Sequence, residues 1–245
     1  MKCCGVIPIR LDSSRFPGKG LAKLGGKEII LHTWERARQY AGFEKLLVAT
    51  DSPEIKSLIE SRGGEVFFSE QRFRNGSERV AAACADVNCE ICVNVQGDEV
   101  FVTPESIVAA VELLESRPEF AVTTAVFPIP GDLDAADPNL VKAALQEDGA
   151  VFGFSRKVFR GLPSTKYPEN YGHIGIYAFR KDFLLKYPTL PESDGERQES
   201  LEQLRVLENG YRIGAVVVDQ PLLAINSPAD LEAAEKYLAM IGGPS

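Results

Sequence analysis

The sequence has few of the histidines and cysteines that zinc sites need, and no apolar run long enough to span a membrane. It contains two histidines and five cysteines, and no apolar run approaches the ~20 residues of a membrane helix. Cys89 and Cys92 form a Cys-x-x-Cys pair near Cys84, but no second pair follows and both histidines are distant in sequence. A structural zinc site is therefore not expected. The first apolar run is short and ends at Pro8, so we expect neither a signal peptide nor membrane insertion.

The chain also lacks the excess of basic residues that nucleic-acid binding requires. Its formal net charge is −8, from 27 Lys and Arg against 35 Asp and Glu. Binding to nucleic acids depends on clustered positive charge, so a nucleic-acid partner is not expected.

The cysteines are odd in number, and Cys3, Cys4 and Cys92 lie in apolar, strand-like runs. We therefore expect reduced core thiols in a cytoplasmic protein.

Neither of the two common glycine-rich phosphate loops is present. Gly18-Lys19 fits the end of a P-loop, but Ser13 stands where its first glycine belongs and Gly20 where its hydroxyl residue belongs. The dinucleotide-binding fingerprint fails as well, because Lys23 stands where its last glycine is needed. Both motif classes are excluded for this segment.

A cationic loop is present instead, directly after the apolar opening of the chain. Arg10, Arg15 and Lys19 follow Cys3-Cys4-Gly5-Val6-Ile7, a run typical of a strand. Open α/β sheets bind ligands at the carboxyl ends of their strands, and cations placed there can hold a polyanion. The alternative is a basic surface turn whose charges are only solvated.

Strand-like and helical patterns alternate in the first half of the chain. Apolar runs at 2–7, 46–50 and 91–95 are separated by amphipathic segments such as 27–41. This alternation predicts an α/β fold with a mostly parallel central sheet covered on both faces. Four further runs follow with few helices between them, at 121–127, 140–145, 151–155 and 173–179. They predict a smaller mixed-strand extension over about 121–195.

Regular α/β character returns toward the end of the sequence. We expect a helix around 198–209, a strand at 213–218 and a last helix beginning at Ser227, which has the Ser-Pro-x-Asp pattern of a helix start. No repeat or low-complexity linker interrupts the chain. Residues 1–245 are therefore expected to form a single domain.

The third strand-like run ends in an acidic turn, Asn94-Val95-Gln96-Gly97-Asp98-Glu99. A carboxylate just past a strand end suits Mg²⁺, which takes a few hard oxygen ligands and keeps substrate phosphates as others. We expect Asp98 to be the ligand, with Glu99 as the second choice. The alternative is an acid that caps the turn before Thr103-Pro104.

Three further segments carry polar residues whose role the local sequence leaves open. Residues 74–79 suit close approach to a base or ribose, yet the same residue types start many helices. His173 and Tyr177 share one face of a strand, which fits either a lined pocket or a core histidine. Glu202 and Gln203 lie beside a leucine stripe, either to bind a polyol or to lie on a solvated helix face.

Taken in order, these segments resemble the 3-deoxy-manno-octulosonate (Kdo) cytidylyltransferase family across nearly the whole chain. The matching motifs are Ile7-Pro8-Ile9-Arg10 with Ser13-Ser14-Arg15-Phe16-Pro17-Gly18-Lys19, Val48-Ala49-Thr50-Asp51, Asn75-Gly76-Ser77-Glu78-Arg79, Asn94-Val95-Gln96-Gly97-Asp98-Glu99, Phe154-Ser155-Arg156, His173-Ile174-Gly175-Ile176-Tyr177 and Glu199-Ser200-Leu201-Glu202-Gln203-Leu204-Arg205-Val206-Leu207. The resemblance implies a three-layer nucleotidyltransferase-like fold that is usually homodimeric. It also implies transfer of CMP from CTP to Kdo with Mg²⁺, giving CMP-Kdo and pyrophosphate for lipopolysaccharide biosynthesis.

The resemblance further implies a role for each matching residue. The residues that would bind the nucleotide are Pro8, Arg10, Arg15, Lys19, Ser77, Arg79 and Gln96, with Arg15, Lys19 and Asp98 catalytic. Those that would bind the sugar acid are Gln96, Arg156, His173, Tyr177, Glu202 and Gln203. The metal ligands would be Asp98 and Asn226, and the mixed-strand extension would serve dimerisation and sugar binding.

One position departs from the family pattern in the metal site. Where the family has the first aspartate of Gly-Val-Asp-Thr-Pro-Glu-Asp, this chain has Asn226, which offers a carbonyl oxygen but no charge. We therefore expect weaker metal binding, or reliance on Glu99 or on additional water. Two alternatives stay open: the same transfer to a related sugar acid such as 8-amino-Kdo, and a non-catalytic protein that only binds nucleotide or sugar.

Overall fold

The structure is a computed structural model, and it describes residues 1–11, 16–131, 133–163, 165–219 and 224–240. The predicted nucleotide ligand Arg15 lies outside these ranges. A nine-stranded sheet forms the centre, and its main path runs in the order β11-β7-β10-β6-β1-β4-β5. These strands are β1 (Cys3–Pro8), β4 (Phe43–Thr50), β5 (Glu65–Phe68), β6 (Ile91–Val95), β7 (Val122–Pro128), β10 (Tyr171–Arg180) and β11 (Ile213–Val217).

The strand directions confirm the mostly parallel sheet. The neighbours from β6 to β5 are parallel, and so are β11 and β7, whereas β10 runs antiparallel to both of its neighbours. Parallel neighbours end at the same edge of a sheet, so the loops after β1 and β6 open side by side. This edge is where the cationic loop and the acidic turn of the sequence meet.

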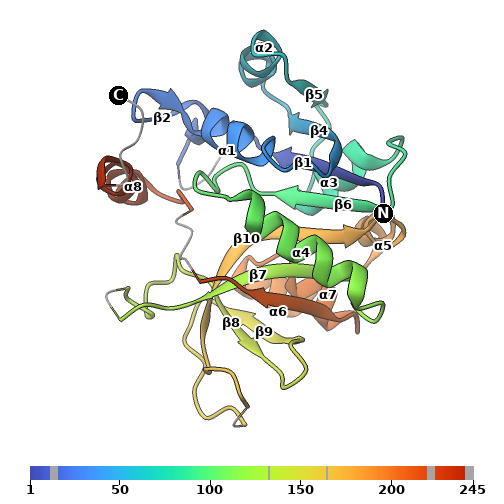
Figure 1. Cartoon of the computed structure of the whole chain (residues 1–245), viewed down its shortest axis with the longest axis vertical. Helices are drawn as coiled ribbons and strands as arrows, with labels where there is room; N and C mark the ends of the chain where they lie inside the picture. Colours follow the sequence, from blue (N-terminus) through green and yellow to red (C-terminus); the bar gives the residue numbers. More distant parts are fainter. Residues whose placement is uncertain (12–15, 132, 164, 220–223, 241–245) are drawn as a thin grey trace.

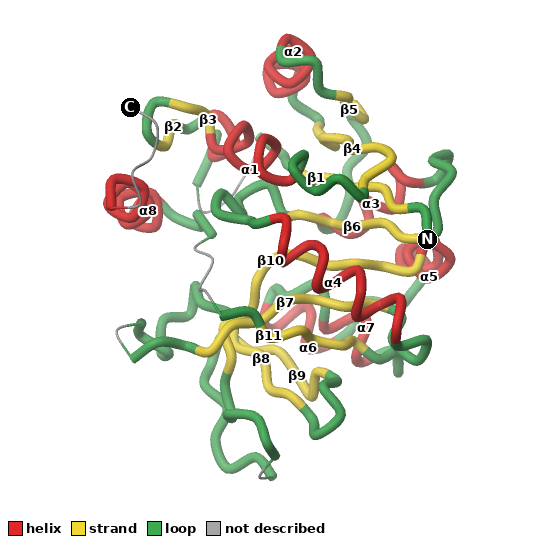
Figure 2. Tube along the Cα trace, in the orientation of Figure 1, coloured by secondary structure: helices red, strands yellow, loops and turns green. Residues whose placement is uncertain are grey.

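Helices cover both faces of the sheet, and each face has its own apolar core (Figures 1 and 2). One face carries α1 (Ile29–Ala37), α2 (Pro53–Ser61), α4 (Pro104–Ser116) and α8 (Pro228–Met240), and the other carries α3 (Gly76–Cys84), α5 (Lys181–Lys186) and α7 (Leu204–Glu208). Because side chains alternate along a strand, Cys3 and Ile7 of β1 join the first core, whereas Cys4 and Val6 join the second. The predicted three-layer α/β fold is confirmed.

The helices begin where the sequence places capping residues. Ser52 precedes Pro53 of α2 and accepts the Ile55 N–H at 3.2 Å. At α8, the Asp230 carboxylate accepts the Ser227 N–H at 2.8 Å and Asp230 N–H donates to the Ser227 hydroxyl at 3.3 Å. This reciprocal cap fixes the start of the last helix and the direction of the segment before it.

Outside the main path, the hairpin of β8 (Lys142–Leu145) and β9 (Val151–Ser155) pairs with the beginning of β10. The extension expected over about 121–195 is therefore smaller, since β7 and β10 belong to the central sheet. A short ribbon of β2 (Lys23–Leu24) and β3 (Lys27–Glu28) precedes α1. Among the described residues, no helix combines the length and apolar character that crossing a bilayer takes.

The prediction of one helix around 198–209 is wrong in one respect, because the structure has two short helices there. They are α6 (Asp194–Glu199) and α7 (Leu204–Glu208), and Ser200 between them has a left-handed φ of 54°. A left-handed residue cannot continue a right-handed helix, and a leucine stripe does not reveal it. The break gives residues 201–203 an irregular path at the edge of the site.

Candidate active site

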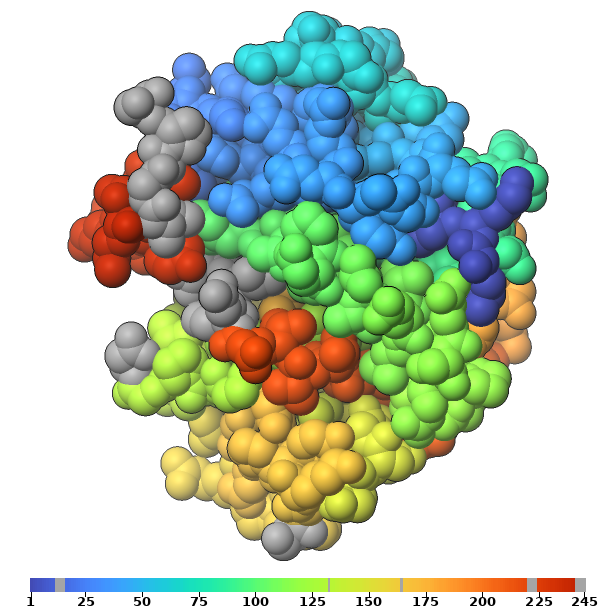
Figure 3. All heavy atoms as spheres, in the orientation of Figure 1, coloured from blue at the N-terminus to red at the C-terminus, as the bar shows by residue number. Residues whose placement is uncertain are grey.

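Two adjoining cavities lie at the carboxyl ends of β1 and β6. The larger has a volume of about 700 Å³ and the smaller about 220 Å³. They share the lining residues Arg10, Asn75, Gly76, Gln96 and Asp98. Figure 3 shows the surface hollowed between α8 and the segment after β7, and Asp230 and Asp134 line the larger cavity from these two sides. A ligand in one cavity would therefore touch a ligand in the other.

The cationic loop and the acidic turn meet through Lys19 and Asp98. Lys19 begins the short helix η1 (Lys19–Leu21) after Gly18, whose φ of 73° is left-handed. The Lys19 ammonium forms an ion pair with the Asp98 carboxylate, and both side chains are largely buried at 14% and 17% exposure. This contact places one cation and one metal-type ligand at the same point of the smaller cavity.

Pro8, Arg10, Lys19, Arg79 and Gln96, all predicted to bind the nucleotide, line the smaller cavity. Arg79 is held on two sides: its Nη2 lies 2.7 Å from an Asp51 carboxylate oxygen, and its guanidinium lies 5.3 Å from the centre of the Phe73 ring. Its Nη1 is buried and has no hydrogen-bond partner among the described residues. A buried donor without a partner is costly, so a ligand oxygen at this position would be stabilised.

Ser77 departs from its predicted role in nucleotide binding. Its side chain is buried and it lines neither cavity. Its backbone N–H donates to the Glu202 carboxylate at 3.0 Å, in the first turn of α3. Ser77 therefore fixes the start of α3 to Glu202 without lining either cavity.

The six residues predicted to bind the sugar acid all line the larger cavity: Gln96, Arg156, His173, Tyr177, Glu202 and Gln203. Arg156 is oriented by the chain itself, because its Nε donates to the Glu199 carbonyl at 2.8 Å and its Nη1 to the Pro138 carbonyl at 2.9 Å. The guanidinium is thus fixed at the rim by backbone oxygens.

His173 is uncharged in this environment. Burial lowers its pKa to about 3. Its ring packs edge-on to Phe154 and against Tyr177, and its Nε2 lies 3.1 Å from the Thr124 hydroxyl. The Thr124 hydroxyl donates to the Ile176 carbonyl at 2.7 Å, which assigns the imidazole proton to Nε2. His173 therefore offers neutral hydrogen-bonding capacity rather than positive charge.

Glu202 lines the larger cavity and contacts Gln96, which lines both cavities. One carboxylate oxygen accepts from Gln96 Nε2 at 3.0 Å and the other from the Ser77 N–H at 3.0 Å. Burial raises the pKa of this carboxyl group above its ordinary value. Glu202 holds Gln96 and the start of α3 in one fixed relation.

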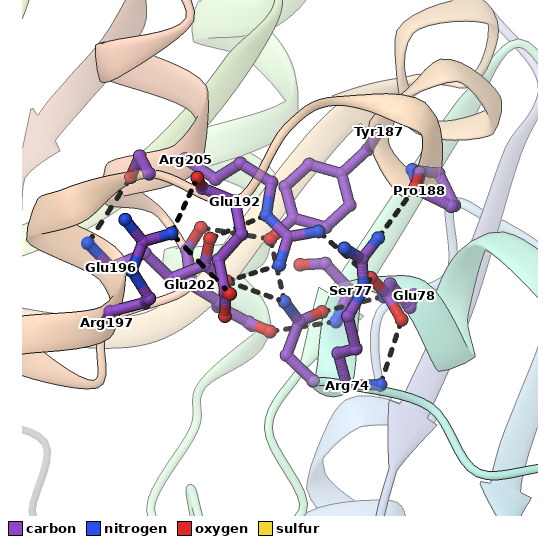
Figure 4. A network of polar contacts seen from close by, with 12 residues as sticks. Arg74, Ser77, Glu78, Tyr187, Pro188, Glu192, Glu196, Arg197, Glu202 and Arg205 are labelled. Atoms are coloured by element: carbon purple, nitrogen blue, oxygen red, sulfur yellow. Dashed lines mark hydrogen bonds and ion pairs between the residues drawn. The ribbon is translucent and has the colours of Figure 1, made fainter.

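A buried ionic network stabilises the segment that carries Glu202 (Figure 4). Arg205 is fully buried and donates two hydrogen bonds of 2.6 Å to Glu196 and one of 2.9 Å to Glu78. Burial lowers the pKa of Arg205, but its hydrogen bonds to Glu196 and Glu78 and the charges of Tyr187 and Glu196 together hold the pKa above its usual range. Removing one partner of such a buried set leaves an unpaired charge, which costs about 3–5 kcal/mol. The network therefore fixes α6 and α7 against α3.

Glu99 is the buried neighbour of Asp98. Its Oε1 accepts the Gly175 N–H at 2.7 Å, and its Oε2 has no hydrogen-bond partner among the described residues. The pairing of β10 with β6 ends at Ile176 opposite Val95, and Gly175 lies just beyond it. Burial, together with the charge of Asp98, raises the pKa of Glu99 to about 8.

The donor set fits a hard divalent cation that also binds a substrate phosphate. Asp98, Glu99 and Asn226 all line the larger cavity. Within the described part of the chain, no three or more His, Cys, Asp and Glu side chains are grouped so that they could hold a metal ion. Mg²⁺ is bound by one or two carboxylates, with water and phosphate oxygens as its remaining ligands. The residues present therefore fit Mg²⁺ and do not form a closed structural site.

Sequence reasoning gave no role to three residues that shape the site. Asp51 and Phe73 hold Arg79, and Asn75 lines both cavities while it caps α3 by accepting the Glu78 N–H at 3.0 Å. Asp51 had a readable signal, since it follows β4 as Asp98 follows β6. Phe73 had none, because its contact depends on the path of a loop.

Comparison with known proteins agrees with this geometry. The family model described as "Cytidylyltransferase" matches residues 4–213. The 3-deoxy-manno-octulosonate cytidylyltransferase of Syntrophotalea carbinolica is 40% identical over 97% of this chain and 99% of its own length. The enzyme of the same name from Leptospira interrogans serovar Lai is 40% identical, with 94% of each chain covered.

Solved structures give the same result. A CMP:2-keto-3-deoxy-manno-octonic acid synthetase complexed with CTP superposes with a TM-score of 0.89 at 33% identity, covering 98% of this chain and all of that one. A cytidylyltransferase from Leptospira borgpetersenii, at 16% identity and a TM-score of 0.66, shares the fold. The chain belongs to the 3-deoxy-manno-octulosonate cytidylyltransferase family.

Proposed function

We propose that this chain transfers CMP from CTP to 3-deoxy-manno-octulosonate, releasing pyrophosphate and forming CMP-Kdo for lipopolysaccharide biosynthesis. The observation that carries the proposal is the pair of adjoining cavities that share Gln96 and Asp98. A transfer between two substrates needs both of them at one point, and the shared wall provides it. The synthetase of the same fold was solved with CTP, which supports CTP as the nucleotide.

The smaller cavity is proposed to hold the nucleotide. Lys19 and Arg10 would neutralise the triphosphate, and the unpartnered Nη1 of Arg79 would donate to a nucleotide oxygen. Mg²⁺ would be held by Asp98 with Asn226, and when bound it supplies positive charge to the phosphate oxygens. Phosphoryl transfer depends mainly on positioning and charge neutralisation, so no covalent intermediate on the protein is required.

The larger cavity is proposed to hold the sugar acid. Arg156 would pair with its carboxylate, and the neutral His173 and Gln203 would bind hydroxyl groups. The anomeric hydroxyl oxygen would then attack the α-phosphorus in line as its proton leaves. The bond from that phosphorus to the pyrophosphate oxygen breaks, and pyrophosphate departs toward Lys19.

Release of pyrophosphate from CTP, Mg²⁺ and Kdo tests the proposal directly. We expect release that depends on the sugar, and release with ATP in place of CTP would contradict the cytosine assignment. Comparing kcat/KM for Kdo and 8-amino-Kdo identifies the preferred acceptor. Intact CTP binding without turnover would replace the proposal with a non-catalytic binding protein.

We also propose that the protein is a homodimer in the cytoplasm. Phe152 on β9 is 54% exposed, which supports a contact through the β8–β9 hairpin. Free cysteines at all five positions support a reducing compartment. Sedimentation velocity is expected to give a dimer that Phe152→Asp dissociates, and a wild-type monomer would contradict the proposal.

A further inference from the structure

Four of the five cysteines gather away from both cavities, in the core under α3. Cys4 comes from β1, Cys84 ends α3, Cys92 belongs to β6, and Cys89 lies in the loop between α3 and β6. All four belong to the same buried cluster of side chains. None of the four lines either substrate cavity. This thiol cluster has no part in the proposed transfer reaction.

Within the thiol cluster, Cys89 and Cys92 are placed to bond. Their sulfur atoms lie 3.5 Å apart, so their side chains already point at each other. A disulfide has a sulfur separation of about 2.05 Å and forms only where the two side chains converge in this way. The sulfur atoms would have to approach further to bond, and Cys89 lies in the loop before β6 rather than in the sheet.

Cys89 is the less buried member of the pair. It is 9% exposed, whereas Cys92 is fully buried. The Val87 carbonyl accepts both the Cys89 N–H, at 3.0 Å, and the Lys181 ammonium. This shared acceptor brings a positive charge close to the Cys89 sulfur. A cation beside a thiol favours the thiolate, which is the reactive form of cysteine.

The surroundings also favour different protonation states for the two sulfurs. Contacts with the Cys4, Cys84 and Cys92 side chains, together with the charge of Lys181, lower the pKa of Cys89 below the usual value of a thiol. Contact with Cys84 lowers the pKa of Cys92, but contact with Cys89 and burial together hold it above the usual value. One sulfur is thus prepared as a nucleophile and the other as a protonated partner.

We propose that Cys89 and Cys92 are a redox-reversible modification site that reacts with low-molecular-weight disulfides, of which oxidised glutathione is the probe. The Cys89 thiolate attacks one sulfur of the small disulfide, whose S–S bond breaks and releases one thiolate. Cys92 then loses its proton and attacks the Cys89 sulfur, which releases the second small thiol. Two protein thiols are oxidised, and one small disulfide is reduced to two thiols.

The test uses the full-length reduced protein, equilibrated in buffers of increasing oxidised-to-reduced glutathione ratio. Remaining thiols are alkylated and counted by intact mass, and the bond is located in proteolytic peptides. We expect loss of two alkylatable thiols, a Cys89–Cys92 link, and full reversal by dithiothreitol. Cys92→Ser should trap glutathione on Cys89, whereas Cys89→Ser should take up none. Circular dichroism checks that each variant is folded.

Cys3→Ser is the matched control, because Cys3 packs in the other core and should leave the oxidation unchanged. The proposal is overturned if all five thiols of the folded protein resist glutathione, or if Cys92→Ser carries glutathione elsewhere. It is equally overturned if the purified protein holds stoichiometric zinc that blocks the thiols. The measurement is independent of cytidylyl transfer, so failure of either proposal leaves the other standing.

Discussion

The two cavities differ sharply in charge although they share a wall. The smaller is lined by three cations and one carboxylate, namely Arg10, Lys19, Arg79 and Asp98. The larger is lined by four arginines and eight carboxylates, namely Arg10, Arg74, Arg156, Arg197, Asp98, Glu99, Asp134, Asp137, Glu192, Glu196, Glu202 and Asp230. Positive charge suits a polyphosphate, and carboxylate oxygens suit the hydroxyl groups of a polyol. The difference in charge therefore supports the proposed place of each substrate.

The cavities also differ in how the backbone builds them. The smaller lies just beyond the ends of β1 and β6, beside the first turn of α3. The larger extends to β10, which shifts its register near Gly175, and to the break at Ser200. In the proposed reaction, the smaller would hold the reacting phosphate and the larger would select the acceptor. Substitutions should therefore separate into nucleotide effects and sugar effects.

Lys19→Met removes a cation from the smaller cavity and should have the largest effect of these substitutions. We expect kcat/KM for CTP to fall about 10²–10³-fold, because one group that stabilises developing charge is lost. Pyrophosphate release measures it. Lys23→Met, at an exposed position nearby, is the control and should leave the rate unchanged. An equal loss of kcat/KM in both variants would contradict the placement of Lys19 in the active site.

Arg156→Met should affect the other cavity by a smaller factor. We expect KM for the sugar acid to rise about 10–100-fold, since a charged hydrogen bond is worth about 1.5–3 kcal/mol, while KM for CTP stays nearly constant. Initial rates at varied sugar and varied CTP separate the two. Lys157→Met, next in sequence and exposed, controls for loss of charge. A matching rise in KM for CTP would contradict the assignment of the cavities.

Asn226→Asp should strengthen binding of Mg²⁺ at the proposed metal site. It restores the carboxylate of the family pattern, and we expect half-saturation by Mg²⁺ at a concentration lower by roughly tenfold, because a charged oxygen binds this cation better than an amide. Mg²⁺ titration of the initial rate measures it. Gln198→Glu adds the same charge at an exposed position outside both cavities. An unchanged Mg²⁺ dependence would remove residue 226 from the site.

His173→Gln should change how the stability of the protein depends on pH in the acid range. The folded state holds His173 neutral with a pKa of about 3, whereas the unfolded chain takes up a proton below about pH 6.5. The wild-type protein therefore loses free energy of unfolding as pH falls from about 6.5 toward 3, by less than about 1.4 kcal/mol per pH unit. Urea unfolding at several pH values should show a shallower loss in the variant. Parallel curves would mean that His173 is not desolvated.

The sequence predicted the regular half of the molecule better than the irregular half. Strand ends at Pro8 and Val95 could be read from apolar runs, and parallel pairing then brought Lys19 and Asp98 together. The break at Ser200 could not be read, because a left-handed residue leaves no mark on hydrophobic periodicity. The internal use of both Glu202 oxygens was equally hidden, since it depends on where α3 begins.

The ion pair between Lys19 and Asp98 has a consequence for the order of events on the protein. The lysine neutralises the aspartate, so a divalent ion would compete with a built-in cation for that carboxylate. In the proposed reaction, an incoming triphosphate would attract the lysine to its own oxygens and would thereby release the aspartate. Metal affinity should consequently rise only when nucleotide is bound, so that cation and nucleotide are captured together.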